Sequence, residues 1–232
     1  MQKNLSVLEK KLNVRFNKIS LLRQALVHKS YINENPKFVL DHNERLEFLG
    51  DAVLELAVTE YLFKHYPRTP EGEMTNWRAS LVNTVMLAVT GDDFGLYQYL
   101  FLSKGERKDQ NPKARQYILA NAFEALIGAI YLDQGIDTAK DFITKNLISK
   151  LSHILQNKLY LDPKTRFQEA AQEKIGVTPV YRVLDEEGPD HAKNFTIGVY
   201  LKDDMVAEGQ GLSKQEAQVQ AALKALQVKK WL

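Results

Sequence analysis

The chain has 232 residues, of which 44% are hydrophobic and 26% are charged, and it contains no cysteine. This composition is typical of a globular protein of one large or two small domains, and it excludes disulfide bonds and thiol catalysis. The formal net charge is only +2, with 21 basic and 18 acidic residues up to Leu161 and 10 basic and 11 acidic residues after it. Any contact with nucleic-acid phosphates must therefore come from local placement of cations, because the bulk charge is not strongly basic.

The sequence contains no membrane or export signal. A membrane-spanning helix needs about 18 consecutive apolar residues, and the longest apolar run, residues 118–132, is interrupted by Asn121 and Glu124. The N-terminus lacks a basic segment followed by an apolar one, so nothing indicates export. Together with the absence of cysteine, this pattern predicts a cytoplasmic protein without a membrane partner.

The first two thirds of the chain are expected to be helical. Helices are expected over residues 5–12, 20–28, 43–66, 69–82 and 137–156. Ser20 is the expected N-cap of the second of these helices, and Pro67 and Pro70 end the third.

One stripe of the helix over residues 43–66 is acidic. Its members, spaced i, i+3, i+7 and i+11 and so confined to about a quarter of the helix circumference, are Glu44, Glu47, Asp51 and Glu55. The face expected to meet the core carries Leu46, Leu49, Val53 and Leu56. An acidic stripe alone is most often a solvated face, whereas a cation held between the carboxylates would remove their repulsion.

A second segment, residues 117–132, gives the acidic stripe a possible partner. Asn121 and Glu124, at i and i+3, are its only strongly polar interior residues. A carboxylate in so apolar a helix is costly unless it is paired or metal-bound. Glycine in a helix interior costs about 1 kcal/mol relative to alanine, so Gly50 and Gly128 indicate that the two helices approach closely.

If the two helices face each other, four side chains form an all-oxygen site. These are Glu47, Asp51, Asn121 and Glu124. Hard oxygen ligands of this kind favour Mg²⁺ or Mn²⁺ over zinc.

The character of the sequence changes after residue 156. A short linker, residues 157–161, precedes a helix that begins at Asp162 with Pro163 in its first turn. Three strands are expected over residues 180–184, 195–201 and 205–208, and Ser213 caps a last helix. The sequence therefore predicts an all-α domain over residues 1–156 and an α+β domain, in the order α-β-β-β-α, over residues 162–232.

Two segments carry a resemblance to a known family. Residues 43–51, with sequence NERLEFLGD, resemble the signature of ribonuclease III, the double-strand-specific endoribonuclease. Residues 118–128, with sequence ILANAFEALIG, resemble the second acidic helix of that family. The order of elements after residue 162 resembles a double-stranded RNA-binding domain.

The resemblance implies an all-α endonuclease domain followed by an α+β double-stranded RNA-binding domain, assembled as a homodimer. Two active sites would each cut one strand of duplex RNA, leaving 5′-phosphate and 3′-hydroxyl ends with short 3′ overhangs. The family also implies processing of ribosomal precursor RNA and messenger RNA. Apolar residues beside the signature, such as Phe48 and the leucine-rich face, would supply the dimer contacts, although such residues more often belong to the core.

The resemblance also assigns roles to single residues. It implies that Glu47, Asp51, Asn121 and Glu124 bind Mg²⁺, with Mn²⁺ as a substitute. Asp51 and Glu124 are the catalytic residues, with Glu124 as the bridging ligand and Asp51 orienting the water and the inner ligands. The RNA-contacting residues that it implies are Glu44 and Glu71 in the first domain and Thr165, Gln168, Glu169, Gly188, Pro189, His191, Ser213 and Lys214 in the second.

The sequence departs from the family pattern at two positions. Asn121 stands where an aspartate is more usual, and its amide oxygen can ligate Mg²⁺ with one negative charge fewer, or act through a water. Gln215 stands where a second basic residue is usual, which should weaken RNA binding and slightly flatten its salt dependence.

The sequence leaves other interpretations open. In the first, the chain is a double-stranded RNA-binding protein whose nuclease domain has weakened or lost activity, and Asn121 favours it. The intact Glu47, Asp51 and Glu124 favour an active enzyme instead. A helical scaffold with no RNA role is the least specific alternative, and the paired acidic segments speak against it.

Overall fold

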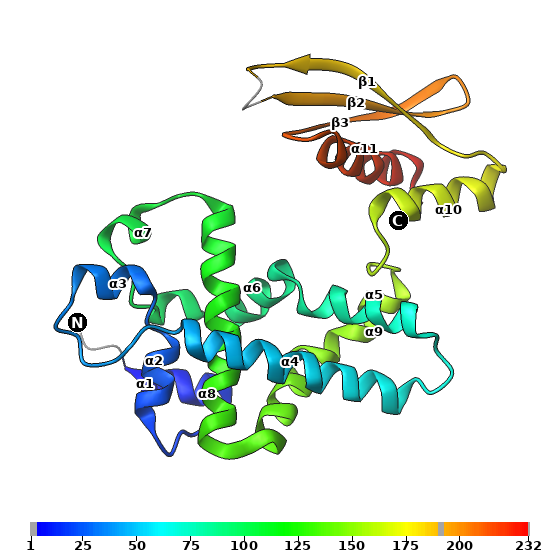
Figure 1. The fold of residues 1–232 in the computed structure, drawn as a ribbon. Coiled ribbons are helices and arrows are strands. Elements are labelled where there is room, and N and C mark those ends of the chain that lie inside the picture. Colours follow the sequence, from blue (N-terminus) through cyan, green and yellow to red (C-terminus); the bar gives the residue numbers. More distant parts are fainter. Residues whose placement is uncertain (1–3, 190–192, 232) are drawn as a thin grey trace. The chain divides into compact units, whose positions relative to one another are not determined.

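The computed structural model describes residues 4–189 and 193–231. The chain divides into two compact units, Met1–Ile154 and Leu155–Leu232. The first unit is helical, and the second combines helices with a three-stranded antiparallel sheet (Figure 1), so the predicted fold class is confirmed. In the described part of the chain, no helix combines the length and the apolar character needed to cross a membrane.

The first unit contains long helices joined by short ones. Its helices, with η denoting a 3-10 helix, are α1 (Leu5–Leu12), α2 (Ile19–Ala25), α3 (Lys29–Glu34), α4 (Glu44–His65), α5 (Glu71–Val82), α6 (Thr84–Asp93), η1 (Leu96–Tyr99), α7 (Lys104–Lys108), α8 (Pro112–Asn146) and η2 (Ile148–Lys150); α9 (Leu151–Gln156) follows at the boundary between the units.

Two helix boundaries differ from the sequence-based expectation. Ser20 is not an N-cap, because α2 begins at Ile19 and follows Lys18, whose side chain makes no capping bond. The backbone N–H groups of Asn17 and Lys18 instead donate to the Asp133 carboxylate at 2.7 and 2.8 Å. The chain just before α2 is therefore held by a residue more than a hundred positions away, which local sequence cannot indicate.

The single helix expected over residues 137–156 is divided in the structure. The helix α8 runs from Pro112 to Asn146 with a break in helical geometry at Gly135, whose φ is 84°, so its second segment starts close to residue 137 but ends ten residues early, and η2 and α9 follow. At the start of α8, the Asn111 side chain accepts a hydrogen bond from Lys113 N at 3.0 Å. Gly135 adopts the left-handed backbone region that glycine tolerates best.

Helices α4 and α8 cross with their backbones in contact, as Gly50 and Gly128 indicated (Figure 1). A Cβ atom added to Gly50 would lie 1.8 Å from the Glu124 carbonyl oxygen, and one added to Gly128 would lie 2.2 Å from the Leu46 carbonyl oxygen. Only glycine fits at either position, so the expected close approach is confirmed. This crossing fixes the register of the two helices.

The crossing also decides which residues of α4 reach the core. Leu46 and Val53 are buried as expected, but Leu56 is 56% exposed, so its assignment to the core face is wrong. The buried stripe is centred on Gly50 and continues through Leu54. The leucine pattern alone did not reveal that the buried face of α4 is rotated from the expected one toward Gly50.

Asn43, immediately before α4, is buried and ties the start of that helix to two other segments. Its side-chain Nδ2 donates to the Ala25 carbonyl oxygen at 3.2 Å, and its backbone N–H donates to the Val27 carbonyl oxygen at 2.8 Å. Val27 in turn forms an isolated parallel bridge with Phe101. These bonds anchor the end of α4 that carries the acidic stripe.

His28 caps the helix α3 in the same region. Its Nδ1 accepts a hydrogen bond from Ser30 N at 3.4 Å and lies 2.8 Å from Ser30 Oγ. Because Ser30 Oγ accepts from Ser103 N at 3.1 Å, its own hydrogen is available for His28 Nδ1. Burial lowers the pKa of His28, while Glu106 and Glu44 oppose the shift.

The second unit packs two helices on one face of the sheet. Its elements are α10 (Pro163–Ile175), β1 (Val180–Glu187), β2 (Asn194–Leu201), β3 (Asp204–Gly211) and α11 (Lys214–Lys229), with the strands in the order β1-β2-β3. The core between helices and sheet includes Phe167, Val199, Leu201, Ala221 and Leu226. At Gly209, a Cβ atom would lie 2.2 Å from Ala221 N, so glycine lets α11 lie directly on β3.

We expect Gly50→Ala to destabilise the first unit by about 3 kcal/mol or more, since overpacking against a rigid backbone forces the helices apart. Gly72→Ala is the matched control, because a Cβ atom there meets nothing within 4 Å on α5. Urea unfolding followed by circular dichroism measures both. Equal stability of the two variants would contradict the backbone contact.

We expect the stability that His28 contributes by capping α3 to decrease at acid pH. Its pKa lies below the ordinary value of 6.5, so the stability that the neutral ring contributes is fully present above that pH. This contribution is lost as the pH falls through the lowered pKa. The unfolding free energy of the wild type should therefore drop relative to that of His28→Asn, which can cap without titrating, between about pH 7 and pH 5. If the difference in unfolding free energy between the wild type and His28→Asn stays constant with pH, His28 does not contribute to stability through a titrating cap.

Candidate active site and nucleic-acid interface

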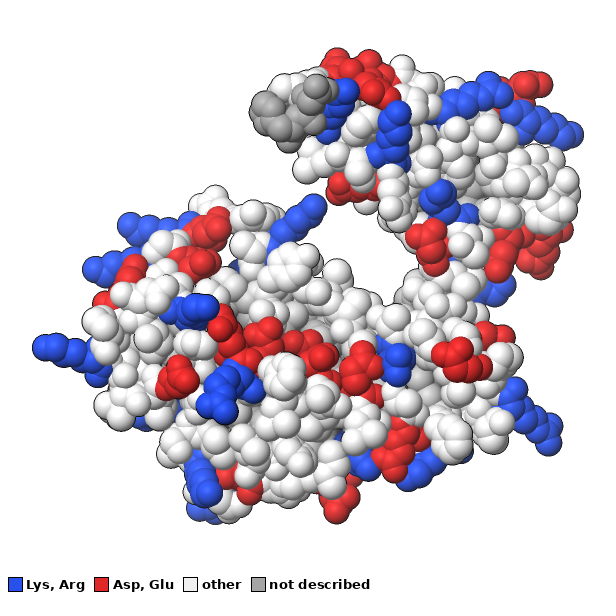
Figure 2. Space-filling view, viewed as in Figure 1, with Lys and Arg blue, Asp and Glu red and all other residues white. Residues whose placement is uncertain are grey.

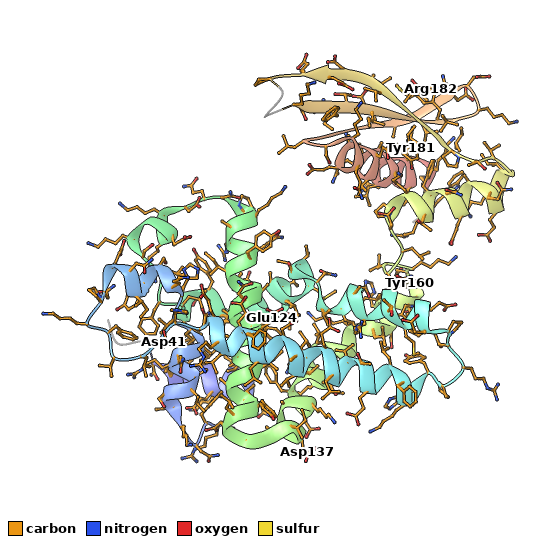
Figure 3. All side chains as sticks on the ribbon, viewed as in Figure 1. Asp41, Glu124, Asp137, Tyr160, Tyr181 and Arg182 are labelled. Atoms are coloured by element: carbon orange, nitrogen blue, oxygen red, sulfur yellow. The ribbon has the colours of Figure 1, made fainter. Side chains whose placement is uncertain are left out.

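The predicted metal ligands come from the two helices that cross at the glycines. Glu47 and Asp51 flank Gly50 on α4, and Asn121 and Glu124 lie on α8, where the Glu124 backbone meets Gly50. Asn121 hydrogen-bonds the Glu47 side chain. Figure 3 labels Glu124 at the crossing, and Figure 2 shows acidic side chains gathered over the same region.

The carboxylates at the crossing repel one another in a partly buried setting. Burial raises the pKa of Glu124 to about 7, and the charges of Asp51 and Glu47 add to the shift. Burial also raises the pKa of Glu47, with Glu44 and Asp51 adding to the shift and the Asn121 hydrogen bond opposing it. Both directions show that the site disfavours its own negative charge in the absence of a cation.

The two ends of the acidic stripe are neutralised by basic side chains. The Glu44 carboxylate lies 3.2 Å from Lys29 Nζ and 3.6 Å from His42 Nδ1, and the Glu55 carboxylate lies 2.9 Å from Arg78 Nε. These pairs leave the middle of the stripe as the part whose charge is uncompensated.

The middle of the stripe has no such partners. Within residues 4–189 and 193–231, no lysine, arginine or histidine lies within ion-pair distance of Glu47, Asp51 or Glu124. Glu47 and Glu124 are half-buried and Asp51 is exposed, and burying carboxylates near other negative charges without a partner is costly. The arrangement therefore favours an external cation.

The donor set fits a hard divalent ion in its chemistry. Its three carboxylates and one amide offer only oxygen ligands, which Mg²⁺ and Mn²⁺ prefer. Among the described residues, no group of three or more histidine, cysteine, aspartate or glutamate side chains is arranged to hold a metal ion by itself.

Glu71 lies apart from this cluster, in the first turn of α5. Thr75 Oγ1 donates a hydrogen bond to its carboxylate at 2.9 Å. Glu71 lines a groove of about 280 Å³ between α4 and α5. The remaining residues that line this groove are Thr59, Leu62, Phe63, Met74, Thr75 and Arg78.

In the second unit, the predicted RNA-contacting residues are distributed over three elements. Thr165, Gln168 and Glu169 are exposed on α10. Gly188, with a φ of 99°, and Pro189 are exposed where the chain leaves β1. The predicted contact at His191 lies outside the described residues.

The start of α11 carries the other two predicted contacts. Ser213 Oγ caps the helix by accepting a hydrogen bond from Glu216 N at 3.1 Å. Lys214 Nζ lies 2.7 Å from the Glu186 carboxylate of β1 and 5.4 Å from the centre of the Phe195 ring. The structure therefore brings the end of β1 next to the first turn of α11.

The sequence did not indicate two polar residues of this unit that form contacts between its elements. Glu186 forms the ion pair with Lys214, and Lys164 Nζ donates to Gln218 Oε1 at 2.6 Å. Each contact joins residues that are tens of positions apart in the chain, so no local pattern could reveal it.

Comparisons with known proteins cover both units. A family model described as Ribonuclease-III-like matches residues 18–151, and one described as Double-stranded RNA binding motif matches residues 163–229.

Similar proteins extend over nearly the whole chain. A protein named Ribonuclease 3 from Pelotomaculum thermopropionicum is 44% identical over 97% of this chain and 93% of its own length. Another of that name, from Carboxydothermus hydrogenoformans, is 44% identical over 99% of this chain and 97% of its own length.

Among solved structures, the nuclease domain of ribonuclease III from Campylobacter jejuni is similar to the first part of the chain. That structure, described for flexibility in a region involved in dimer formation, is 39% identical with a TM-score of 0.54. The match covers 62% of this chain and 98% of the Campylobacter domain. With a helical unit that matches the nuclease model and a second unit that matches the RNA-binding motif, the chain belongs to the ribonuclease III family.

Proposed function

We propose that the protein is an endoribonuclease that hydrolyses phosphodiester bonds in double-stranded RNA with a divalent metal. Its products carry 5′-phosphate and 3′-hydroxyl ends with short 3′ overhangs. The observation that carries the proposal is the set of unpaired carboxylates, Glu47, Asp51 and Glu124, at the crossing of α4 with α8. Family membership supports the same activity.

The residues that would hold the metal are Glu47, Asp51, Asn121 and Glu124. Mg²⁺, or Mn²⁺ in its place, lowers the pKa of a bound water and neutralises charge that develops on the phosphate. Asp51 and Glu124 are the proposed catalytic residues, since the Asp51 charge acts on Glu124, which is the more buried of the two. Asn121 interacts with the Glu47 carboxylate beside them and lowers its pKa, against the effect of burial.

Duplex RNA would be bound by the second unit and by two acids of the first. The proposed contacts are Glu44, Glu71, Thr165, Gln168, Glu169, Gly188, Pro189, His191, Ser213 and Lys214. The match of residues 163–229 to a double-stranded RNA binding motif supports this assignment for the second unit. Such domains recognise the duplex by its shape and its phosphates across about 16 base pairs.

We further infer a homodimer that acts in the cytoplasm on ribosomal precursor RNA and messenger RNA. Phe48, on α4 beside the acidic cluster, is 82% exposed, which is unusual for a large aromatic side chain unless it meets a partner. The Campylobacter relative, whose nuclease domain has a region involved in dimer formation, supports the same assembly. The absence of cysteine fits a reducing compartment.

The first experiment is cleavage of an end-labelled RNA duplex of roughly 30 base pairs, long enough for one RNA-binding domain. We expect cutting with Mg²⁺, none with EDTA, and a loss of about 10³-fold in rate for Glu124→Gln, because several kcal/mol of metal-dependent stabilisation disappear. Glu73→Gln, an exposed acid on α5, is the matched control and should cut normally.

The same assay tests the role of Asn121. Asn121→Asp adds a fourth negative charge, so half-maximal cutting should need less Mg²⁺ than in the wild type. If the wild type binds the duplex without cutting and only Asn121→Asp cuts, the natural protein is a silenced nuclease. If no variant cuts at any Mg²⁺ concentration, the catalytic proposal is wrong.

The dimer is tested by Phe48→Asp in analytical ultracentrifugation. Burial of a large aromatic side chain at an interface is commonly worth about 2 kcal/mol or more, so the dimer should dissociate at concentrations where the wild type stays associated. Val228→Asp is the control, since Val228 is 63% exposed on α11 of the second unit. An unchanged sedimentation coefficient for Phe48→Asp would exclude this interface.

A further inference from the structure

Lys164, in the first turn of α10, is held in a fixed position by two contacts with other elements. Its Nζ donates to Gln218 Oε1 on α11 at 2.6 Å and lies 5.3 Å from the centre of the Tyr181 ring on β1. Figure 3 labels Tyr181 on the sheet of this unit. A lysine whose side chain is already ordered loses less conformational entropy when it binds a ligand.

The ring beneath Lys164 supplies a neutral surface. Within the described residues, the Tyr181 hydroxyl is buried without a hydrogen-bond partner. Burial raises the pKa of Tyr181 to about 12, with a further contribution from Asp162, so the ring carries no charge near neutral pH. The contact with Lys164 is therefore of the cation–π type and leaves the positive charge of the ammonium in place.

No carboxylate neutralises this ammonium. In the described ranges, Lys164 Nζ has no aspartate or glutamate oxygen within 4 Å, and Asp162 uses its side chain to accept from the backbone N–H groups of Lys164 and Thr165 at 2.9 and 3.4 Å. An ammonium group has three donors, and the bond to Gln218 accounts for one of them. Lys164 can thus donate to an anionic ligand without losing its present contacts.

The lysine predicted from the sequence is in the opposite situation. Lys214 is paired with Glu186 at 2.7 Å, and this bond lowers the pKa of Glu186. A phosphate that approaches Lys214 therefore also meets a carboxylate. Gln218 lies one turn after Lys214, at i+4 on the same face of α11. Because Lys164 Nζ is bonded to Gln218, it lies beside the face of α11 that carries Lys214.

We propose that Lys164, positioned by Gln218 and the Tyr181 ring, is a phosphate-contacting residue of the RNA-binding unit, one helical turn along α11 from Lys214. The inference rests on the proposed binding of double-stranded RNA and adds a residue to that interface. Lys164 supplies from α10 a cation at a position where α11 itself carries the neutral Gln218.

The test measures binding of a fluorescent 30-base-pair RNA duplex (a length of roughly two domain footprints) to the full chain in EDTA, where no cleavage occurs. We expect Lys164→Gln to bind more weakly and to reduce the slope of log affinity against log salt by about one. When the salt concentration rises from 50 to 200 mM, the factor by which affinity falls should thus be roughly threefold smaller for the variant than for the wild type. Lys174→Gln on α10 makes the same charge change about 15 Å along the helix axis and should leave the slope unchanged.

The transposed variant Lys164→Gln with Gln218→Lys keeps the lysine–glutamine pair and moves the cation to α11. We expect it to recover the affinity and the slope, which separates a phosphate contact from a packing role. An unchanged slope in Lys164→Gln, or a loss that the transposition does not restore, would overturn the proposal. Failure of the wild type to bind the duplex at all would instead refute the proposed RNA-binding function.

Discussion

The backbone contact between α4 and α8 is the constraint on which the candidate site depends. At Gly50 and Gly128 the two helices are closer than any side chain allows, so neither helix can slide along or rotate about its axis without a clash. The residues next to the contact are therefore placed by the fixed position and rotation of the two helices. The backbone positions of Glu47, Asp51 and Glu124 are therefore fixed relative to one another before any ligand binds.

This arrangement sets stability against activity. Burial of Glu124, together with repulsion from Asp51 and Glu47, disfavours its ionised form in the folded state and raises its pKa to about 7. The ion pairs of Glu44 and Glu55 confine the repulsion to the centre of the stripe. A protein that evolved only for stability would place a lysine or an arginine among these acids. Asn121 partly offsets this effect, because its interaction with Glu47 lowers the pKa of that carboxyl without adding a charge.

Much of the fold and of the site was accessible from the sequence, since its signals are local or periodic. The spacing of the acids on α4, the glycines in two helix interiors and the alternation of the strands each predicted a feature that the structure contains. The missed features depend on contacts between distant positions. The bonds from Asn17 and Lys18 to Asp133 and the bond from Lys164 to Gln218 have no signal in the local sequence, and the exposure of Leu56 follows from where α8 crosses.

The end of the first segment of α8 is tied to the chain before α2. The Asp133 carboxylate accepts from Asn17 N and Lys18 N, and Gln134 Nε2 donates to the Arg15 carbonyl oxygen at 2.9 Å, just before the helix breaks at Gly135. The helix that carries Glu124 is therefore held at this end by Arg15, Asn17 and Lys18, of which the first two precede the family match that starts at residue 18. A fragment trimmed to the matched region would keep only the bond from Lys18, so a boundary drawn from the family match alone would remove contacts that hold the end of the site helix.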